Sequence, residues 1–423
     1  MSDPYVPRLV DTEIEERLKS NGAVRIEGVK HCGKTRTSAM HSASVCFTGS
    51  LSHNPAAPVD TDDSTDNTLF GDNPCLIDEW QSFPSVWGAV ERILDKTSSK
   101  GLFILCGSAL PDGCTDFGNG CLGTIPTLHM RTMSLFESSD SDGSVSLSAL
   151  FRNEPVVGSP NKSTLRKLSD LIVRGGWPGT IAASTAGGKT AVSGFLYELY
   201  ENLFEAVNSR SSSKSILLLR ALARNESTTI SASALSRDIR EHDGGVMKPT
   251  TIQKYLAVFD RMFLTENQPA YVPDLRPAFR IVKTPKRHLA DPSLAAAALG
   301  LDSRDLMNDV RVFDPFFEAL CERDLQIYAT AIGGRLLHFK DVKGRKIDAI
   351  VELPDGRWGA FEIESASNRV DVAAKNLSRV SALISGDPNG REPEFLCVLC
   401  GILPAPYRRE DGVYVVPICS LGP

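Results

Sequence analysis

Eight consecutive residues near the N-terminus constrain the fold more than any other stretch of the chain. They follow the pattern G-x-x-x-x-G-K-[ST] and are Gly28, Val29, Lys30, His31, Cys32, Gly33, Lys34 and Thr35. In this pattern the glycines let the backbone curve, so that successive N–H groups point at phosphate oxygens. The lysine reaches the β- and γ-phosphates, and the threonine hydroxyl binds Mg²⁺. The stretch therefore predicts a Walker A loop that binds ATP together with Mg²⁺.

The residues on either side of this loop fit the same interpretation. Residues 23–27 alternate in polarity and include β-branched side chains, which predicts a strand. Residues 35–40 have the composition to start a helix. A strand, a loop and a helix in this order are the context that the motif requires. The start of the helix adds the positive end of its dipole to the phosphate site.

A second motif follows about forty residues later. Residues 74–79 read Pro-Cys-Leu-Ile-Asp-Glu, a short apolar strand that ends in two acids, as in a Walker B motif. At the tip of such a strand, Asp78 is predicted to hold Mg²⁺, which prefers oxygen ligands. Glu79 is predicted to orient and polarise the attacking water.

The segments that come next predict a parallel α/β sheet. Residues 84–94 form an amphipathic helical pattern, and residues 101–106 are continuously apolar, as buried parallel strands are. This strand ends in Gly107 and Ser108. Ser108 either senses the γ-phosphate or belongs to an ordinary turn at the end of the strand. Strands that alternate with helices indicate a parallel sheet.

Length and composition limit the class of protein. The chain has 423 residues, which predicts two to four domains, and a net charge of −6, which argues against a generally basic nucleic-acid binder. Its ten cysteines are scattered, as in reduced intracellular proteins. The sequence shows neither a leader peptide nor an apolar run long enough for a membrane span. We therefore expect a cytoplasmic protein without membrane contact.

The middle of the chain predicts helices. After a polar stretch at residues 138–163, residues 164–225 read as helical. Residues 230–270 have helix-turn-helix character, with a first helix at 232–239 and a second that Pro249 opens. The second helix has one apolar face and one polar face, and the polar face comprises Thr250, Thr251, Gln253, Lys254 and Arg261. This polar face either contacts nucleic acid or is merely solvated.

The C-terminal part predicts another sheet. Four segments read as strands: residues 336–340, 347–353, 358–364 and 395–400. The second and third flank a Pro-Asp-Gly turn, which predicts a hairpin. Cys397 and Cys400 lack a second cysteine pair or a nearby histidine, so a buried strand explains them better than a metal site.

Together these motifs resemble a family of prokaryotic ATPases that join an AAA+-type P-loop module to a C-terminal restriction-endonuclease-like domain. The resemblance covers nearly the whole chain, and its markers besides the Walker A loop are residues 7–11, 76–81, 107–108, 130–137, 174–178, 286–288, 291–293 and 407–412. It implies an α/β fold in three parts. These are an AAA+-type P-loop ATPase domain at 1–150, a helical and winged-helix-like domain at 151–305, and a restriction-endonuclease-like domain at 306–423.

The chain departs from the family pattern at one arginine. The family carries Gly-Arg-Ile ahead of the segment that begins here at Met130, whereas this chain has Gly123-Thr124-Ile125. An arginine that acts on the γ-phosphate is worth roughly 10³-fold or more in rate, so its absence predicts weak hydrolysis. Arg131 is the best remaining cation, acting across the subunit interface of a homo-oligomer. The alternative role for Arg131 is a structural ion pair.

A second departure concerns the nuclease-like part. The family fold places acids and a lysine so that the acids hold Mg²⁺ and the lysine stabilises charge during phosphodiester cleavage. Glu318, Asp348 and Glu362 match the acid positions, but Glu364 stands at the lysine position. This charge reversal favours a retained scaffold over an active nuclease. The function we expect is an ATPase that couples its nucleotide state to a protein or nucleic-acid partner. The alternatives are a nucleotide-dependent DNA-binding regulator and a Mg²⁺-dependent nuclease.

Overall fold

The computed structural model describes residues 5–46, 71–82, 84–108, 125–156, 160–181, 183, 185–206, 212–273 and 280–423. The chain divides into two compact units, which we describe separately. Unit 1 comprises Met1–Thr132 and Arg261–Phe263, and unit 2 comprises Met133–Asp260 and Leu264–Pro423. The division into three domains at residues 150 and 305 stays a prediction.

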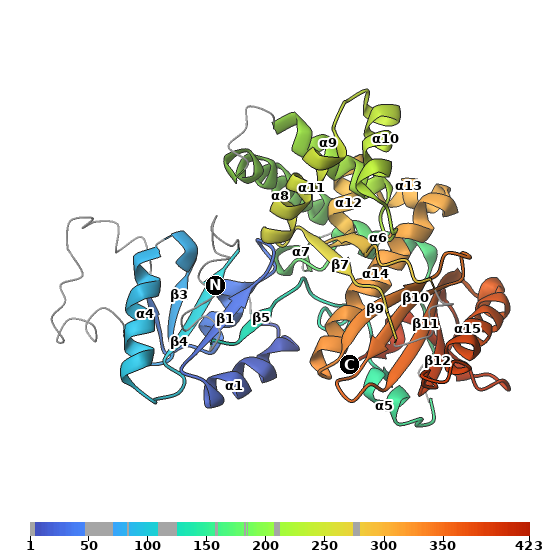
Figure 1. The fold of residues 1–423 in the computed structure, drawn as a ribbon, viewed down its shortest axis with the longest axis horizontal. Helices are drawn as coiled ribbons and strands as arrows, with labels where there is room; N and C mark the ends of the chain where they lie inside the picture. The colour runs from blue at the N-terminus through green and yellow to red at the C-terminus, as the bar shows by residue number, and fades with distance from the viewer. Residues whose placement is uncertain are drawn as a thin grey trace. The chain divides into compact units, whose positions relative to one another are not determined.

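Unit 1 is built on a parallel sheet whose strand order is β2-β3-β4-β1-β5 (Figure 1). Its strands are β1 (Ala23–Glu27), β2 (Ser44–Cys46), β3 (Cys75–Asp78), β4 (Phe103–Gly107) and β5 (Thr127–His129). Its helices are α1 (Val10–Ser20), α2 (Lys34–Met40) and α4 (Pro84–Lys96), with a 3-10 turn η2 (Trp80–Ser82). The predicted parallel α/β sheet is thereby confirmed. This order places β3, which ends in Asp78, and β4, which Ser108 follows, on the same side of β1, the strand that precedes the predicted phosphate-binding loop.

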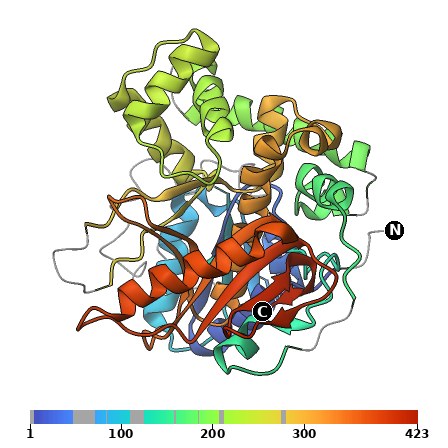
Figure 2. The same cartoon turned by 90° about the vertical axis from the view of Figure 1, so that its right-hand side faces the viewer.

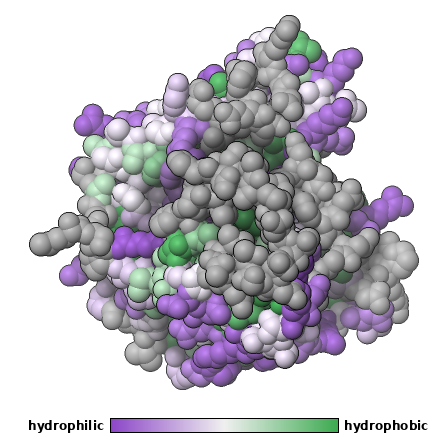
Figure 3. Space-filling model, turned by 90° about the vertical axis from the view of Figure 1, so that its left-hand side faces the viewer, coloured by the Kyte–Doolittle hydropathy of each residue, from purple (hydrophilic) through white to green (hydrophobic). Residues whose placement is uncertain are grey.

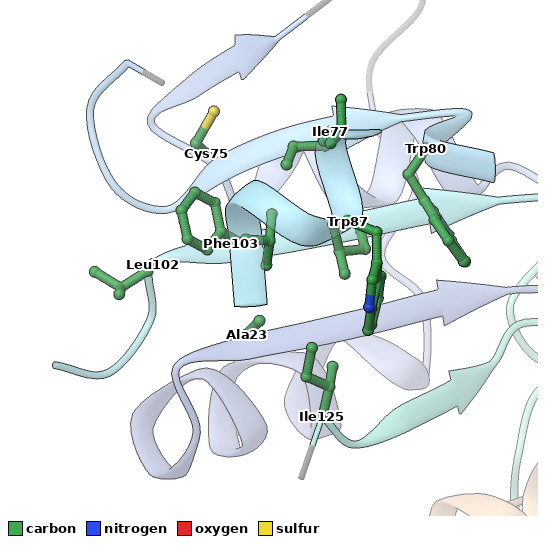
Figure 4. Close-up of a cluster of buried hydrophobic side chains, with 11 residues drawn as sticks. Ala23, Cys75, Ile77, Trp80, Trp87, Leu102, Phe103 and Ile125 are labelled. Carbon is green, nitrogen blue, oxygen red and sulfur yellow. The ribbon is translucent and has the colours of Figure 1, made fainter. Parts of the chain in front are cut away.

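The core of unit 1 explains why these segments form strands and a helix. β4 is buried along its whole length, as its unbroken apolar sequence predicts for a parallel strand. One face of α4 packs on the sheet, and Figure 4 shows Trp87 of this helix beside Trp80. The two indole rings lie with their centroids 5.2 Å apart. Aromatic pairs in such tilted contact add roughly 0.5–1.5 kcal/mol beyond the area they bury.

Unit 2 begins with short elements that lead into helices. They are β6 (Val145–Ser146), which pairs with the C-terminal β15 (Leu421–Gly422), and α5 (Leu147–Phe151). The helices that follow are α6 (Leu165–Arg174), α7 (Pro178–Ile181), α8 (Thr185–Ala206), α9 (Ser212–Arg224), α10 (Ala232–Asp243), α11 (Pro249–Arg261), α12 (Pro292–Leu299) and α13 (Ser303–Asn308). The predicted helical middle part of the chain is thus present.

Helices α10 and α11 and the turn between them lie where the sequence predicts a helix, a turn and a second helix. The turn starts at Gly244, whose φ of 62° ends α10 in the left-handed conformation that glycine adopts without strain. The apolar residues of α11 that the periodicity predicts to face the core are all buried: Ile252, Tyr255, Leu256 and Phe259. On the polar face, Thr250, Gln253 and Lys254 are exposed as predicted, whereas Thr251 is half-buried.

A two-stranded antiparallel sheet follows α11. It consists of β7 (Thr265–Gln268) and β8 (Lys286–Leu289), which pair from Thr265 with Leu289 to Gln268 with Lys286. A single bridge also joins Thr228 to Arg287. The strands therefore connect the loop between α9 and α10 with the segment that precedes α12.

The C-terminal part of unit 2 is a mixed sheet of strand order β13-β14-β12-β11-β10-β9. Its strands are β9 (Arg335–Lys340), β10 (Lys346–Glu352), β11 (Trp358–Ala366), β12 (Phe395–Ile402), β13 (Tyr407–Arg408) and β14 (Tyr414–Pro417). All four predicted strands are present, and β10 and β11 form the predicted hairpin. Gly356 in its turn has a φ of 82°, which explains the glycine there.

Two helices cover opposite faces of this sheet. Trp358 and Ala360 of β11 share a buried cluster with Leu377 of α15 (Val370–Ser385), which Figure 2 shows lying along the sheet in orange-red. On β11 the side chain of Ser365 points the other way, because alternate residues of a strand face opposite sides. Its hydroxyl donates to Asp314 Oδ1 of α14 (Val310–Ala331) at 2.6 Å.

Among the described residues visible in Figure 3, polar side chains predominate and the hydrophobic ones gather only in small patches. Among the described helices, none combines the length and the apolar composition needed to cross a lipid bilayer.

Candidate nucleotide-binding site

The predicted phosphate-binding loop lies between β1 and α2. A side chain at Gly28 would bring its Cβ to 2.0 Å from the carbonyl oxygen of Met130, so only glycine fits against this neighbouring segment. Gly33 has a φ of 104° and immediately precedes α2, where a residue with a Cβ would be strained. Both glycines of the pattern are therefore explained by the backbone that they allow.

Lys34 is the first residue of α2, and its side chain turns back onto the loop. It is 95% buried, and its Nζ donates a hydrogen bond to the carbonyl oxygen of Val29 at 2.9 Å. Among the described residues, the hydrogen-bond acceptor of this ammonium group is a neutral carbonyl oxygen, which leaves its positive charge available for an anion. The eight predicted loop residues thus form one continuous loop and helix start around this charge.

The predicted metal-binding residues come together beside the loop. Thr35 Oγ1 donates to Asp78 Oδ1 at 3.2 Å, although the two residues come from different elements, α2 and β3. A hydroxyl and a carboxylate oxygen are the donor types that Mg²⁺ takes in phosphate sites. The pKa of the Cys106 thiol on the adjacent strand is raised by burial and by the charge of Asp78, while Lys34 acts in the opposite direction. Asp78 and Lys34 therefore both lie close to Cys106.

Glu79 directly follows β3 in an unusual backbone conformation. Its φ of 50° is left-handed, which a residue with a side chain adopts only when the surroundings impose it. Ser108 Oγ donates to Glu79 Oε2 at 3.0 Å, and Gln81 Nε2 donates to the same oxygen. The carboxylate is thus fixed in one orientation at the end of the sheet. Ser108 thus orients Glu79, and its role as a sensor of the γ-phosphate stays a prediction.

Arg131 lies directly after Met130, whose carbonyl oxygen packs against Gly28. Its side chain is half-buried, and its carbonyl oxygen accepts a hydrogen bond from Arg8 at 2.9 Å. Gly123 and Thr124, where the family pattern has an arginine, lie outside the described residues. The role of Arg131 at the γ-phosphate stays a prediction.

Sequence reasoning missed Arg8, although it lies within a marker of the resemblance. This buried guanidinium donates to the carbonyl oxygen of Cys32 in the loop at 3.0 Å and to that of Arg131. The Cys32 thiol also donates to the Met130 carbonyl oxygen at 3.3 Å. Arg8 therefore acts as a brace, since it links the phosphate-binding loop at Cys32 to the segment at Arg131. No local sequence pattern predicts this role of Arg8, because its hydrogen-bond acceptors are backbone atoms of segments that are distant in the sequence.

Asp11 holds the N-terminal segment on this brace. Its carboxylate accepts hydrogen bonds from the Arg8 backbone N–H at 2.7 Å, from the Tyr5 hydroxyl at 2.7 Å and from His41 at 3.1 Å. Burial would raise the pKa of Asp11, but these hydrogen bonds, His41's foremost, outweigh it and lower the pKa. Asp11 therefore stays ionised at neutral pH and fixes the position of Arg8.

We expect Arg8→Ala to lower the free energy of unfolding by about 2 kcal/mol, because the buried carbonyl oxygen of Cys32 and the partly buried one of Arg131 lose the hydrogen bonds that Arg8 donates. Urea unfolding followed by tryptophan fluorescence would measure this. Arg17→Ala is the matched control, since its half-exposed side chain makes only a 3.2 Å pair with Glu13 on the same helix. It should cost less than about 0.5 kcal/mol. Equal losses in the two variants would contradict a bracing role.

The predicted nuclease-like acids lie in unit 2, and the structure surrounds them with lysines. Lys286 of β8 donates to Glu318 and, at 2.5 Å, to Glu322, which sequence reasoning did not single out. Lys346 donates to Asp348 Oδ1 at 2.8 Å. The acids on α14 and β10 therefore already have cationic partners from the chain itself.

The two glutamates on β11 have raised pKa values and partners from the chain itself, unlike the ionised carboxylates that usually bind metal ions. Glu362 is buried, and burial together with the charge of Asp348 raises its pKa to about 9, so the carboxyl group is protonated at neutral pH. Asn376 donates to its Oε1 at 3.0 Å. Glu364 has a pKa raised by burial, and Arg369 lies 3.5 Å from it. Within the described part of the chain, no group of three or more His, Cys, Asp or Glu side chains is placed to hold a metal ion.

The five-stranded parallel sheet, the loop between β1 and α2 and the acidic end of β3 fit a P-loop NTPase fold. Comparison with known proteins adds little evidence for this fold class. A family model described as a domain of unknown function (DUF8612) matches residues 165–305, which is well under half of the chain. This segment begins with α6 and ends within α13. No curated protein matches the chain.

Two solved structures show weak similarity. A Walker-type ATPase of Pyrococcus abyssi is 12% identical with a TM-score of 0.41, over 70% of this chain and 96% of that one. Cdc6p from Pyrobaculum aerophilum is 13% identical with a TM-score of 0.22, over 71% of this chain and 96% of that one. At these TM-scores the similarities carry no weight, so the fold rests on the strand order and the loop geometry.

Proposed function

We propose that the chain is an AAA+-type ATPase that binds ATP with Mg²⁺ and couples its nucleotide state to a protein or nucleic-acid partner. The observation that carries this proposal is the hydrogen bond between Thr35 and Asp78 beside the buried ammonium group of Lys34. A site for ATP with Mg²⁺ needs an ammonium group, a hydroxyl group and a carboxylate close together. Lys34, Thr35 and Asp78 supply these three groups here.

The chain's own residues have separate tasks in this proposal. Lys34 exchanges the Val29 carbonyl oxygen for phosphate oxygens when a nucleotide enters. Glu79, oriented by Ser108 and Gln81, accepts a hydrogen bond from the attacking water. Thr35 and Asp78 would hold Mg²⁺, which neutralises charge on the phosphates. Arg131 is the cation proposed to act across the interface of a homo-oligomer.

A short stretch of chain supports the coupling part of the proposal. Met130 and Arg131 are held to the phosphate-binding loop and its brace through their carbonyl oxygens. Only a few residues later, Leu135 N–H donates to buried Asp324 Oδ2 at 2.9 Å in unit 2. A change in the loop on nucleotide binding therefore has a direct covalent route into unit 2.

A second candidate function is a nucleotide-dependent DNA-binding regulator. The observation in its favour is that α11 is followed by the antiparallel pair β7 and β8, as in a winged-helix module. Exposed Thr250, Gln253 and Lys254 on α11 suit contacts to a nucleic acid. A gel-shift assay with duplex DNA, with and without ATP, tests it. A shift that needs ATP would favour the regulator over a protein-partner switch.

For the restriction-endonuclease-like part we propose a retained scaffold without nuclease activity. Two observations support this: Lys286 between Glu318 and Glu322, and the Asp348–Lys346 pair. A divalent cation would have to compete with these lysines for the carboxylate oxygens. Mg²⁺-dependent nicking of plasmid DNA that is lost in Asp348→Ala would overturn this part.

We expect Lys34→Ala to weaken ATP binding about 10- to 100-fold, because a charge-assisted hydrogen bond to phosphate is worth roughly 1.5–3 kcal/mol. Titration with a fluorescent ATP analogue in the presence of Mg²⁺ measures this. Lys19→Ala removes the same charge from the exposed end of α1 and should leave the affinity unchanged. If Lys34→Ala bound the nucleotide as tightly as the unaltered chain, the proposed site would be wrong.

A further inference from the structure

Unit 2 contains a cavity of about 450 Å³ beside the nuclease-like acids Glu318 and Asp348, and the proposed ATPase activity does not use it. It lies between the loop that joins α9 to α10 and the strands β8, β9 and β10, the last two of which are marked in Figure 1. The residues that line it are mostly polar: Asn225, Ser227, Thr228, Thr229, Ile230, Lys286, Glu318, His338, Phe339, Lys340, Lys346, Ile347 and Asp348. Its volume suits a small ligand of nucleotide size.

Three lysines line this cavity, and they differ in how their charges are balanced. Lys286 is paired with Glu318 and Glu322, and Lys346 is paired with Asp348. Lys340 is half-buried, and its Nζ donates to Thr229 Oγ1 at 3.0 Å. Among the described residues, no carboxylate forms an ion pair with it. A hydroxyl group does not neutralise an ammonium charge, so the cavity has a cation without a counter-charge.

The neighbouring histidine reports the same positive environment. Burial and the charges of Lys286 and Lys340 together lower the pKa of His338 to about 4. His338 is therefore neutral at pH 7, and its Nε2 lies 3.1 Å from the carbonyl oxygen of Thr284. A neutral His338 neither adds to the positive charge of Lys340 nor balances it.

Further cations lie beside Lys340 on the protein surface. Residues 280–282 run alongside the end of β9, since Val282 N–H donates to the Lys340 carbonyl oxygen at 2.9 Å and Val342 N–H donates to the Arg280 carbonyl oxygen at 3.0 Å. Arg280, Lys283 and Lys343, whose side chains are exposed, therefore belong to the segments that lie next to Lys340. Such a group attracts an anion that extends beyond the cavity.

We propose that this cavity binds a phosphate ester without a metal ion, and that Lys340 supplies the charge that neutralises it. The hydroxyl groups of Thr228 and Thr229 provide further polar contacts at the cavity wall. A phosphate suits this arrangement because its charge balances Lys340 and its several oxygens accept hydrogen bonds from hydroxyl and ammonium donors. The phosphate ester comes either from the backbone of a nucleic acid or from a free nucleotide.

The acids of the same region fit a site without metal. Lys286 pairs with Glu318 and Glu322, and Lys346 pairs with Asp348. Burial also raises the pKa of both glutamates, so these three acids carry less negative charge than three free carboxylates and repel a phosphate less. The site belongs to unit 2 and does not depend on the phosphate-binding loop of unit 1. It therefore stands even where the ATPase proposal fails.

The test uses the full chain carrying Lys34→Ala, in EDTA, so that neither the loop nor a metal contributes. A fluorescein-labelled DNA duplex is titrated by anisotropy, and AMP is titrated by calorimetry. We expect one of the two to bind, and Lys340→Ala to weaken it about tenfold or more. Binding of the duplex alone identifies a nucleic-acid backbone, whereas binding of AMP identifies a free nucleotide.

Two further variants make the result specific. Lys340→Arg keeps the charge and should retain binding, which separates the charge from a general effect on folding. Lys375→Ala removes an exposed lysine of α15 that does not line the cavity and should change nothing. The proposal is overturned if neither ligand binds, if Lys340→Ala binds as well as its parent, or if binding appears only when Mg²⁺ replaces EDTA.

Discussion

Glu79→Gln is expected to lower the rate of ATP turnover by about 10²- to 10³-fold while ATP binding stays within about twofold, since a positioned general base contributes roughly 10²–10⁴ in rate. Glutamine keeps the size of the side chain and its acceptance of hydrogen bonds from Ser108 and Gln81. It lacks the negative charge that polarises water. Release of inorganic phosphate measures turnover, and titration with a fluorescent ATP analogue measures binding.

The control for this prediction is Glu16→Gln, which removes the same charge from an exposed position on α1. It should leave both measurements unchanged. Turnover that survives in Glu79→Gln would show that another group activates water. If the unaltered chain binds ATP tightly but releases no phosphate, the protein holds the nucleotide without hydrolysing it. That outcome would agree with the missing arginine at Thr124.

Local sequence pattern was sufficient for most of the secondary structure. Residues 101–106 predicted a buried strand, and β4 is buried throughout. It is an interior strand of the sheet, with β3 on one side and β1 on the other. Asp355 and Gly356 predicted a hairpin, and β10 and β11 pair on either side of them. In each case the residues that decide the outcome are neighbours in the chain. The phosphate-binding loop is a further example, since its glycines are needed by its own backbone.

The interactions between distant segments could not be predicted in this way. Ser108 read either as a sensor of phosphate or as part of a turn, and its hydrogen bond to Glu79 could not be foreseen from the sequence. Lys286 read only as part of a marker motif, yet it is buried between two glutamates of α14. Both outcomes depend on how separate elements pack. A sequence pattern records the type of side chain but not which partner the fold brings within reach.

One buried group of charges shows what several marker motifs have in common. Arg323 of α14 pairs with Asp291 at 3.0 Å and with Asp324 at 2.7 Å, and both aspartates are fully buried. Asp324 accepts a hydrogen bond from Leu135 N–H, and Asp291 accepts one from Gly176 N–H at 3.0 Å. Segments at 130–137, 174–178 and 291–293 therefore meet at one guanidinium. These motifs hold unit 2 together and need no catalytic role to explain them.

We therefore expect Arg323→Met to lower the free energy of unfolding of unit 2 by about 3–5 kcal/mol, because two buried carboxylates lose their cation. Such a loss is a large part of the roughly 5–15 kcal/mol that stabilises a domain. Hydrogen exchange should show faster exchange at the amides of Leu135 and Gly176, whose acceptors are those carboxylates. Arg311→Met is the matched control on the same helix, since its side chain is 95% exposed and should cost less than about 0.5 kcal/mol. If Arg323→Met unfolded no more easily than Arg311→Met, the charge cluster would not be what anchors the segment that leads from the phosphate-binding loop into unit 2.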